Sequence, residues 1–361
     1  MNNQPSNQSQ DRSVPVYILS GFLGSGKTTL LVQLLEHWKK QGLRPAVIMN
    51  ELGEVNLDGQ VVDESVPMAE MLGGCICCTV RGDLGLQLSE LIQTESPDVI
   101  IIEATGAANP MEILDGVTET SLYMRLELKS LITVVDAAHL WGLHAEQKGK
   151  TFRLMQDQIR CASVLLLNKT DRVNDRELEE LQQLLAKWNA YAPVIGTVKC
   201  QVDMDMLLRA GTGVQSPSRS LTGNEPDSDH GSADSHVHTA ECALHGCSHG
   251  HDKHDHAGHR HEAHASHEHV MVYTHYFTKP VNSEAFERFV ANLPRDVYRA
   301  KGILTFSDTA SRFWFQYAYQ ESDYMKINPQ GQVPNVAVFI GEHFEQGAIR
   351  EQLLALEGTA E

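Results

Sequence analysis

The sequence predicts an α/β protein with a mostly parallel sheet, followed by a small α+β domain at its C-terminal end. In the first part of the chain, short continuous apolar runs alternate with helical segments, a pattern typical of parallel strands buried on both faces. In the last part, aromatic-rich strand candidates lie between helices. A long segment between the two shows no hydrophobic period, which indicates a linker.

The elements expected in the larger domain follow from these runs. Strands are predicted at 16–19, 46–49, 98–103, 131–136 and 164–168, and helices at 28–40 and 177–188. In the second helix, leucines 178, 181, 184 and 185 fall along one face. The smaller domain is predicted to contain strands at 270–277, 311–319 and 336–340, and helices at 283–293 and 345–356.

Four regions result from this division. Residues 1–13 are rich in Asn, Gln and Ser and are expected to form a disordered tail. Residues 14–212 form the larger domain, 213–269 the His-rich linker and 270–361 the small C-terminal domain.

Composition excludes several classes of protein. The chain has 29 Lys+Arg against 47 Asp+Glu, so its net charge of −18 argues against nucleic acid as a partner. No apolar run is long enough for a membrane span, and the polar first residues lack the apolar core of a signal peptide. A cytoplasmic protein without a membrane partner is expected. The seven Cys are too sparse for a disulfide scaffold.

A phosphate-binding motif lies between the first predicted strand and the first predicted helix. Residues 21–28 read Gly-Phe-Leu-Gly-Ser-Gly-Lys-Thr and fit G-x-x-x-x-G-K-[ST] in full. Backbone N–H groups of such a loop wrap phosphates, with Lys27 near the β- and γ-phosphates and the Thr28 hydroxyl on Mg²⁺. The predicted phosphate-binding residues are Gly21, Gly24, Ser25, Gly26, Lys27, Thr28 and Thr29.

A second motif selects the base. Asn168-Lys169-Thr170-Asp171 follows a predicted strand, and the Asp171 carboxylate can accept two hydrogen bonds from the guanine edge. Adenine offers no such donor pair, so the site should reject it. Alone the tetrapeptide could be an ordinary turn. Downstream of a phosphate loop it favours GTP and GDP, with Asn168 and Lys169 as further binding residues.

Two glutamates follow apolar strands and are candidates for the catalytic machinery beside Lys27. Glu103 ends the strand at 98–103, where it can reach Mg²⁺ directly or through water. Glu51 follows the strand at 46–49 and is a candidate for a loop that senses the γ-phosphate. An exposed acid at a strand end is the alternative for Glu103.

Three cysteines, Cys75, Cys77 and Cys78, fall within four residues. Thiolates at this density suit Zn²⁺ or Cu(I), and three ligands leave a tetrahedral zinc one open position for transfer to a client. A redox pair or simple burial are the alternatives, although the spacing matches C-x-x-C poorly.

Thirteen of the 18 His lie between His230 and His269. Imidazoles bind Zn²⁺, Co²⁺, Ni²⁺ and Cu²⁺, so this segment is predicted to collect metal, with His249, His251, His254 and His256 as candidate ligands. A solvated linker that binds metal only incidentally is the alternative.

The order of these motifs resembles that of CobW-like GTPases. The resemblance covers about 14–356, and its specific feature is Gly-Cys-Ile-Cys-Cys-Thr-Val-Arg-Gly-Asp-Leu at 74–84. The family's usual Glu-x-Ser-Gly reads Glu103-Ala-Thr-Gly here, and its Ala-Asp-Pro reads Ala-Asn109-Pro. No clear loop covers the far side of the guanine; residues 197–200 are where we expect it.

The resemblance implies a GTP-dependent metallochaperone that delivers a metal to a client protein. We therefore expect a slow GTPase whose nucleotide state gates Zn²⁺ at Cys75, Cys77 and Cys78, with the C-terminal domain recognising the client metalloprotein. A nucleotide-dependent homo-oligomer is possible. The alternatives are a cobalt chaperone for cobalamin synthesis, a His-rich zinc store or sensor, and a metal-independent regulatory GTPase.

Overall fold

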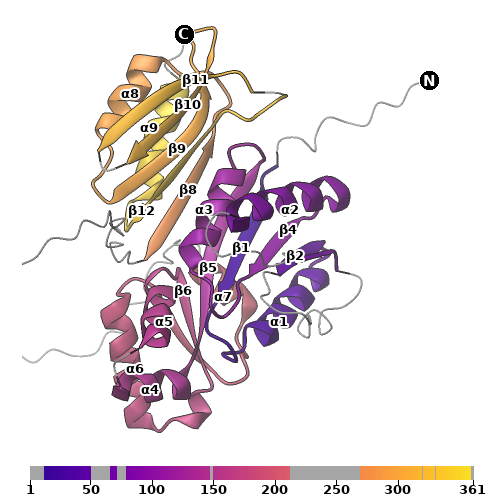
Figure 1. Cartoon of the computed structure of the whole chain (residues 1–361), viewed down its shortest axis with the longest axis vertical. Coiled ribbons are helices and arrows are strands. Elements are labelled where there is room, and N and C mark those ends of the chain that lie inside the picture. The colour runs from indigo at the N-terminus through magenta and orange to yellow at the C-terminus, as the bar shows by residue number, and fades with distance from the viewer. Residues whose placement is uncertain are drawn as a thin grey trace, which may run out of the picture. The chain divides into compact units, whose positions relative to one another are not determined.

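The structure is a computed structural model. It describes residues 12–49, 66–70, 79–146, 149–211, 269–318, 320–329 and 331–358. Figure 1 shows two layered parts, a larger one built on a parallel sheet and a smaller one built on an antiparallel sheet. The predicted fold class is thereby confirmed.

The larger sheet has seven strands in the order β3-β2-β4-β1-β5-β6-β7, and every neighbouring pair is parallel. The strands are β1 (Val14–Ser20), β2 (Pro45–Met49), β3 (Met68–Glu70), β4 (Val99–Glu103), β5 (Leu126–Asp136), β6 (Val164–Asn168) and β7 (Val194–Thr197). The chain first builds outward on one side of β1 and then continues on the other side with β5. In open parallel sheets ligands bind at the carboxyl ends of the strands where the order reverses, and the phosphate-binding motif begins at the carboxyl end of β1.

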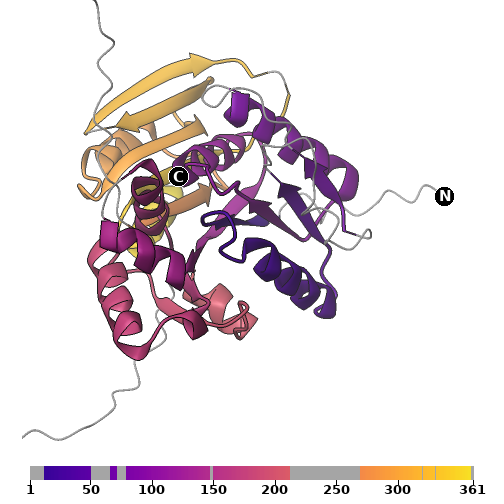
Figure 2. The same ribbon diagram turned by 60° about the horizontal axis from the view of Figure 1, so that its bottom comes forward.

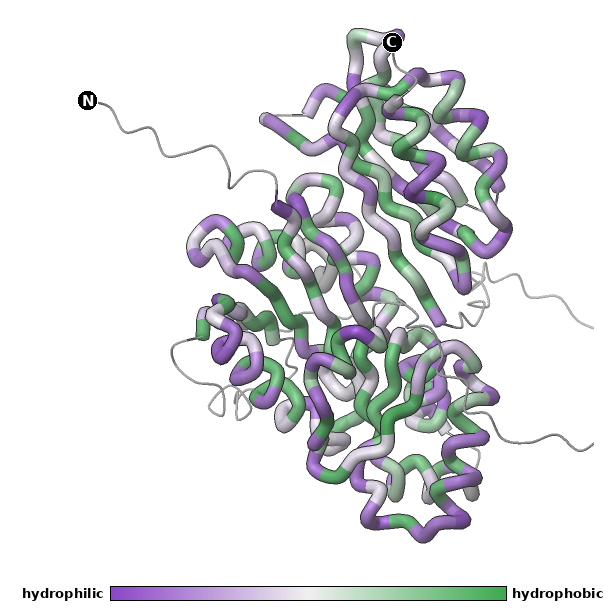
Figure 3. Tube along the Cα trace, turned by 180° about the vertical axis from the view of Figure 1, so that it is seen from behind, coloured by the Kyte–Doolittle hydropathy of each residue, from purple (hydrophilic) through white to green (hydrophobic). Residues whose placement is uncertain are grey.

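Helices cover both faces of this sheet. Apolar side chains of α1 (Lys27–Lys40) and α7 (Met204–Ala210) pack on one face. The other face is covered by α2 (Thr79–Glu95), α3 (Pro110–Thr120), α4 (Ala137–Glu146), α5 (Lys150–Arg160) and α6 (Asp175–Trp188). Figure 3 shows the central strands as the hydrophobic layer, because strands buried on both faces carry continuous apolar runs.

The smaller sheet has five antiparallel strands in the order β11-β10-β9-β12-β8. Its elements are β8 (Val270–Tyr276), α8 (Ser283–Ala291), β9 (Val297–Thr305), β10 (Arg312–Ala318), β11 (Glu321–Ile327), β12 (Val336–Glu342) and α9 (Gln346–Gly358). An aromatic core that includes Phe286, Phe315 and Phe339 packs beneath α8 and α9. Figure 2 shows the smaller sheet and its helices from a second direction.

The two sheets belong to one compact unit, made of the chain up to Val214 and from Ser266 onward. Val270, Ile303, Val338 and Ile340 of the smaller sheet fall into the same buried cluster as α3 and β5. Of the described helices, none is long and apolar enough to cross a membrane.

All strands and helices predicted from the sequence are present, with ends shifted by a few residues. Four strands (β3, β7, β9 and β11) and five helices (α2, α3, α4, α5 and α7) were not predicted from the sequence. Of these, β3 and β7 are short edge strands of the larger sheet.

Candidate nucleotide-binding site

The loop between β1 and α1 depends on glycine at three positions. Gly21, Gly24 and Gly26 have φ of 135°, 73° and 116°, a backbone region that other residues rarely adopt. Gly21 and Gly26 also lack space for a side chain. A Cβ at Gly21 would lie 2.2 Å from the Val134 carbonyl oxygen, and one at Gly26 would lie 2.5 Å from Asn168 Nδ2. The loop is therefore pressed against the ends of β5 and β6.

Lys27, the first residue of α1, is almost fully buried within this loop. Its ammonium donates to the carbonyl oxygens of Gly21 and Phe22, at 3.0 and 3.3 Å. The side chain thus folds back over the loop, where it can deliver positive charge to a bound phosphate. This charge is local, because the chain as a whole is strongly acidic.

Thr28 and Glu103 meet at the carboxyl edge of the sheet. The Thr28 hydroxyl donates to Glu103 Oε1 at 3.3 Å, and the Glu103 side chain is buried. A hydroxyl and a carboxylate side by side are hard oxygen ligands, the kind that Mg²⁺ takes together with nucleotide phosphates. The donor set therefore fits the predicted magnesium site.

Asn168 fastens the guanine motif to the phosphate loop. Its Nδ2 donates to the Ser25 carbonyl oxygen at 2.8 Å, and its Oδ1 accepts from the Cys200 backbone N–H at 2.9 Å. Its amide is therefore used for structure, bridging two loops.

Lys169 makes a second link between the two motifs. Its ammonium donates to the Gly24 carbonyl oxygen at 2.8 Å and to Asp136 Oδ2 at 2.6 Å. Asp136 ends β5 beside Asn168 in the sheet register, and its other oxygen accepts from the His139 backbone N–H. Asp171 lies just beyond, in the short 3-10 helix Thr170–Arg172, with its side chain exposed.

Residues 197–200 lie against this motif, where a base-covering loop was expected. Thr197 Oγ1 donates to Asn168 Oδ1, and Thr170 Oγ1 donates to the Thr197 carbonyl oxygen. The buried Cys200 thiol donates to the Gly26 carbonyl oxygen at 3.4 Å. Burial raises the pKa of this thiol to about 11, so it stays protonated near neutral pH.

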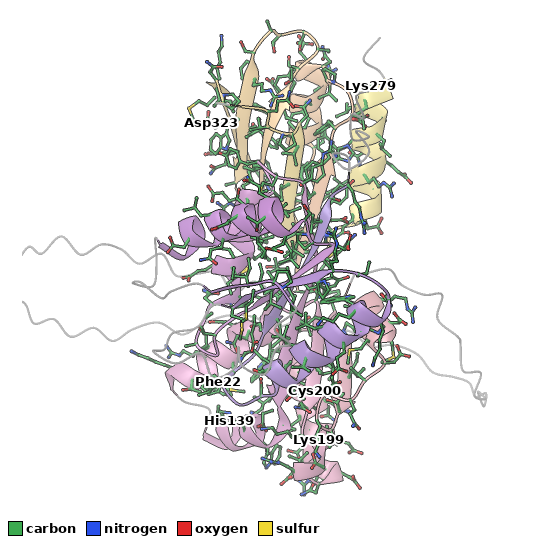
Figure 4. The ribbon with its side chains drawn as sticks, turned by 90° about the vertical axis from the view of Figure 1, so that its right-hand side faces the viewer. Phe22, His139, Lys199, Cys200, Lys279 and Asp323 are labelled. Atoms are coloured by element: carbon green, nitrogen blue, oxygen red, sulfur yellow. The ribbon has the colours of Figure 1, made fainter. Side chains whose placement is uncertain are left out.

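Among the residues labelled in Figure 4, Phe22, His139, Lys199 and Cys200 lie in or beside the phosphate loop. Phe22 of the phosphate loop packs against the His139 ring of α4, with 5.2 Å between ring centroids. On the other side, Lys199 and Cys200 take consecutive positive φ values of 54° and 56°. The phosphate loop is thus flanked by α4 on one side and by the loop with Lys199 and Cys200 on the other.

The other predicted site residues lie outside the described residues. These are Glu51, the three cysteines Cys75, Cys77 and Cys78, and the histidines His249, His251, His254 and His256. Their roles stay predictions. The structure describes the elements on either side of the cysteine segment: β3 ends at Glu70 before it, and α2 begins at Thr79 after it.

Two supporting residues were missed by sequence reasoning. Asp136 holds Lys169, and Cys200 fills the space beneath Gly26. For Asp136 a signal existed, because it ends an apolar strand as Glu103 and Asn168 do. For Cys200 there was none, since a single cysteine in a loop has no pattern.

A phosphate loop at a topological switch point, joined to a guanine-type motif, defines a P-loop nucleotide-binding protein of the GTPase class. Residues 15–196 match the family described as CobW/HypB/UreG, nucleotide-binding domain, and residues 271–357 match the cobalamin synthesis protein cobW C-terminal domain. The chain belongs to the CobW/HypB/UreG family.

Two known proteins, one of them also as a solved structure, are similar to it. A zinc-regulated GTPase metalloprotein activator 1 of Dictyostelium discoideum is 32% identical over 55% of this chain and 48% of its own. The zinc chaperone YjiA of Escherichia coli is 35% identical over 54% of this chain and 60% of its own. The chain thus spans about half the length of these curated relatives. A crystal structure of Zn(II)-bound YjiA GTPase covers 96% of this chain and 99% of its own, with 23% identity and a TM-score of 0.43.

Proposed function

We propose that the protein is a GTP-hydrolysing metallochaperone. It binds Zn²⁺ through Cys75, Cys77 and Cys78, and the binding and hydrolysis of GTP control whether the metal is held or passed to a client protein. The observation that carries this proposal is that β3, the strand before the cysteine segment in the sequence, ends at the same sheet edge as the strands that carry the nucleotide motifs.

The strand register supports this placement. Met49 at the end of β2 pairs with Glu70 at the end of β3 on one side and with Glu103 of β4 on the other. Glu103 in turn pairs with Leu19 of β1, next to the phosphate loop. The segments that follow β2 and β3 therefore start level with the Thr28–Glu103 pair. They carry Glu51 and the three cysteines, respectively.

The nucleotide half of the proposal follows from the site itself. The loop amides and Lys27 would bind the phosphates, and Asp171 the guanine edge. Thr28 and Glu103 would hold Mg²⁺, which would neutralise phosphate charge during transfer to water. Glu51 is proposed to order with the γ-phosphate, which is the mode by which such loops switch.

A chain of packed helices connects the nucleotide edge of the sheet to the C-terminal domain. This connection supports the proposal that the C-terminal domain recognises the client protein. Directly after the cysteine segment, α2 packs closely on α3: a Cβ at Gly116 of α3 would lie 2.9 Å from Leu84 Cδ2. At its other side α3 carries Asp115, which pairs with Arg299 of β9 at 2.9 Å. If α2 shifted, it would therefore push on α3, which contacts the C-terminal sheet.

The test is linkage between metal and nucleotide. Zinc affinity of the full-length protein is measured by competition with a chromophoric chelator, with GDP and with a non-hydrolysable GTP analogue. Because coupling is reciprocal, the nucleotide that tightens zinc binding must itself bind more tightly when zinc is present, by the same factor. Equal zinc affinities in the two nucleotide states would overturn the gating proposal.

Variants separate the alternatives. Replacing Cys77 with Ser should abolish the coupled site, whereas deleting 215–265 should leave both the coupled site and GTP hydrolysis intact. Loss of all tight metal binding on that deletion would favour a His-rich zinc store instead. Repeating the titration with Co²⁺ tests the cobalt alternative, because Co²⁺ takes similar sites.

A further inference from the structure

Two histidines face each other at the point where the His-rich segment enters the C-terminal sheet. β8 pairs antiparallel with β12, and the register joins Val270 to Glu342 at the end of the ladder. Continuing this register by one residue places His269 opposite His343. Their ring centroids lie 5.5 Å apart and the rings are nearly parallel, at 14°.

One ring nitrogen of each histidine is not used for hydrogen bonding. The Nδ1 atoms of His269 and His343 are both buried, and neither has a hydrogen-bond partner among the described residues. A buried polar atom without a partner is costly and calls for an explanation, such as an ion. A backbone hydrogen bond to Ala162 also engages the His269 ring, an arrangement that orients metal-binding histidines elsewhere.

The surroundings hold both rings in place. Tyr191, from the turn between α6 and β7, stacks on His343 with 3.4 Å between centroids and lies 5.8 Å from His269. The His269 backbone N–H donates to the Arg160 carbonyl oxygen at 2.5 Å. Both histidines have positive φ, 46° and 56°, a strained state that often marks functional positions.

We propose that His269 and His343 form a binding site for a divalent zinc-type metal ion, at the end of the His-rich segment and separate from the cysteine site. Two imidazoles on one ion, with Zn–N distances of about 2.0–2.1 Å, have ring centroids no more than ~6.5 Å apart. The observed 5.5 Å satisfies this limit.

The site has two protein ligands. Across the described part of the chain, no group of three or more His, Cys, Asp or Glu side chains is arranged to hold a metal ion. The remaining coordination positions are therefore left to water or to a ligand from another molecule. Such a site binds the metal ion weakly and exchanges it quickly. These properties suit an intermediate site between the His-rich segment, which is proposed to collect metal, and the tighter cysteine site. The inference does not depend on gating by GTP.

The test uses the full-length chain with the twelve histidines from His230 to His267 replaced by Gln, which removes competing imidazoles. One equivalent of Zn²⁺ is added first to occupy the cysteines, and calorimetry then follows further Zn²⁺. We expect one additional weak binding event. His343→Gln and His269→Gln should each weaken it by at least the ~10- to 100-fold that loss of a supporting partner produces at metal sites.

The matched control is His144→Gln. The His144 Nδ1 is also buried without a partner among the described residues, and its ring lies 6.3 Å from Trp141. This substitution should leave the additional event unchanged. Unaltered GDP affinity and an unaltered unfolding midpoint without metal identify variants that are folded.

A second measurement keeps the result decisive if a variant is unstable. With ¹⁵N-labelled histidine in the same background, Zn²⁺ should shift the Nδ1 resonances of His269 and His343 together. An additional event that survives both substitutions, or resonances that stay in place on saturation, would overturn the proposal. Failure of GTP gating would leave both readouts unaffected.

Discussion

Individual side chains at the nucleotide site act mainly by holding other groups in position. Asn168 donates a hydrogen bond to the backbone carbonyl oxygen of Ser25, and Lys169 donates one to that of Gly24. Asp136 then fixes the Lys169 ammonium at 2.6 Å. The shape of the phosphate loop is therefore set from outside the loop, by the ends of β5 and β6.

Replacing Asp136 with Asn should weaken nucleotide binding. The Lys169–Asp136 pair is mostly buried, with side-chain exposures of 25% and 12%, so it is screened only in part. Hydrogen bonds to charged groups contribute about 1.5–3 kcal/mol, so GDP affinity should fall by about 10-fold or more. Fluorescence titration with a labelled GDP measures this. Asp205→Asn is the control, because Asp205 pairs with His37 and is 54% exposed. Equal losses in the two variants would contradict the assignment.

The buried thiols of Cys161 and Cys200 should resist alkylation in the folded protein. Burial raises their pKa to about 12 and about 11, so near neutral pH neither forms the reactive thiolate. Iodoacetamide labelling read by mass spectrometry should find both unmodified in buffer and modified in urea. Labelling of Cys200 in the folded protein would show that its loop opens.

The same shifts predict the direction of a pH effect on stability. Unfolded thiols lose their protons near about pH 8.5, whereas the folded ones keep them. The unfolded state then binds fewer protons, so the free energy of unfolding falls as pH rises. This stabilisation is complete below that pH and is lost as pH rises towards about 11, the pKa of folded Cys200. Urea midpoints across this range should show less decline in Cys200→Ala.

At the scale of elements, the sequence predicted strands from their apolar or aromatic runs and missed β9, where an interface places charges in a strand. β9 carries Arg299 and Lys301 on the face that meets α3, where the alternation of a buried strand calls for apolar residues. Only the packing of α3 against this sheet explains them: Asp115 accepts from Arg299, and the Asp115 carbonyl oxygen accepts from buried Lys301. No local pattern contains that information.

Tyr276 of β8 connects the C-terminal sheet to the end of α3. Its hydroxyl accepts from the Leu126 N–H at 2.7 Å and lies 2.8 to 3.3 Å from the carbonyl oxygens of Ser121, Met124 and Leu126. Burial raises the pKa of its hydroxyl above the usual range, so the hydroxyl stays protonated and donates.

Tyr276→Phe should therefore destabilise the protein by about 1–3 kcal/mol, the cost of leaving a buried donor or acceptor without its partner. Urea unfolding followed by circular dichroism gives the change. Tyr123→Phe is the matched control, because Tyr123 is 55% exposed and its hydroxyl loses little. A Tyr276→Phe variant as stable as Tyr123→Phe would show that water replaces the lost hydrogen bonds.

At the scale of the whole molecule, sequence reasoning located the nucleotide motifs because each one occupies a strand end of fixed spacing. It did not find the way they are joined. The links among Asp136, Lys169 and Gly24 span most of the larger domain in sequence, and only the sheet order brings them together. The pairing of His269 with His343 likewise depends on the register of β8 and β12.

The shared core predicts that the two sheets unfold together. Val270, Ile303 and Val338 of the C-terminal sheet are buried in one cluster with Leu126 of β5 and Leu114 of α3, so separating the sheets would expose apolar surface on both. Calorimetry should show a single transition whose calorimetric and van't Hoff enthalpies agree.

Ligand binding extends this prediction. The predicted GDP site lies in the larger domain alone. GDP should still raise the midpoint of the whole transition, because a ligand that binds only the folded state stabilises everything that unfolds with its site. Trp314 reports on the smaller sheet, and Trp38, Trp141 and Trp188 report on the larger domain. Trp314→Phe should therefore change the fluorescence amplitude but not the midpoint seen by circular dichroism. Two transitions, with GDP shifting only one, would mean that the C-terminal sheet folds separately and that the contacts of α3 cannot carry the nucleotide state to it.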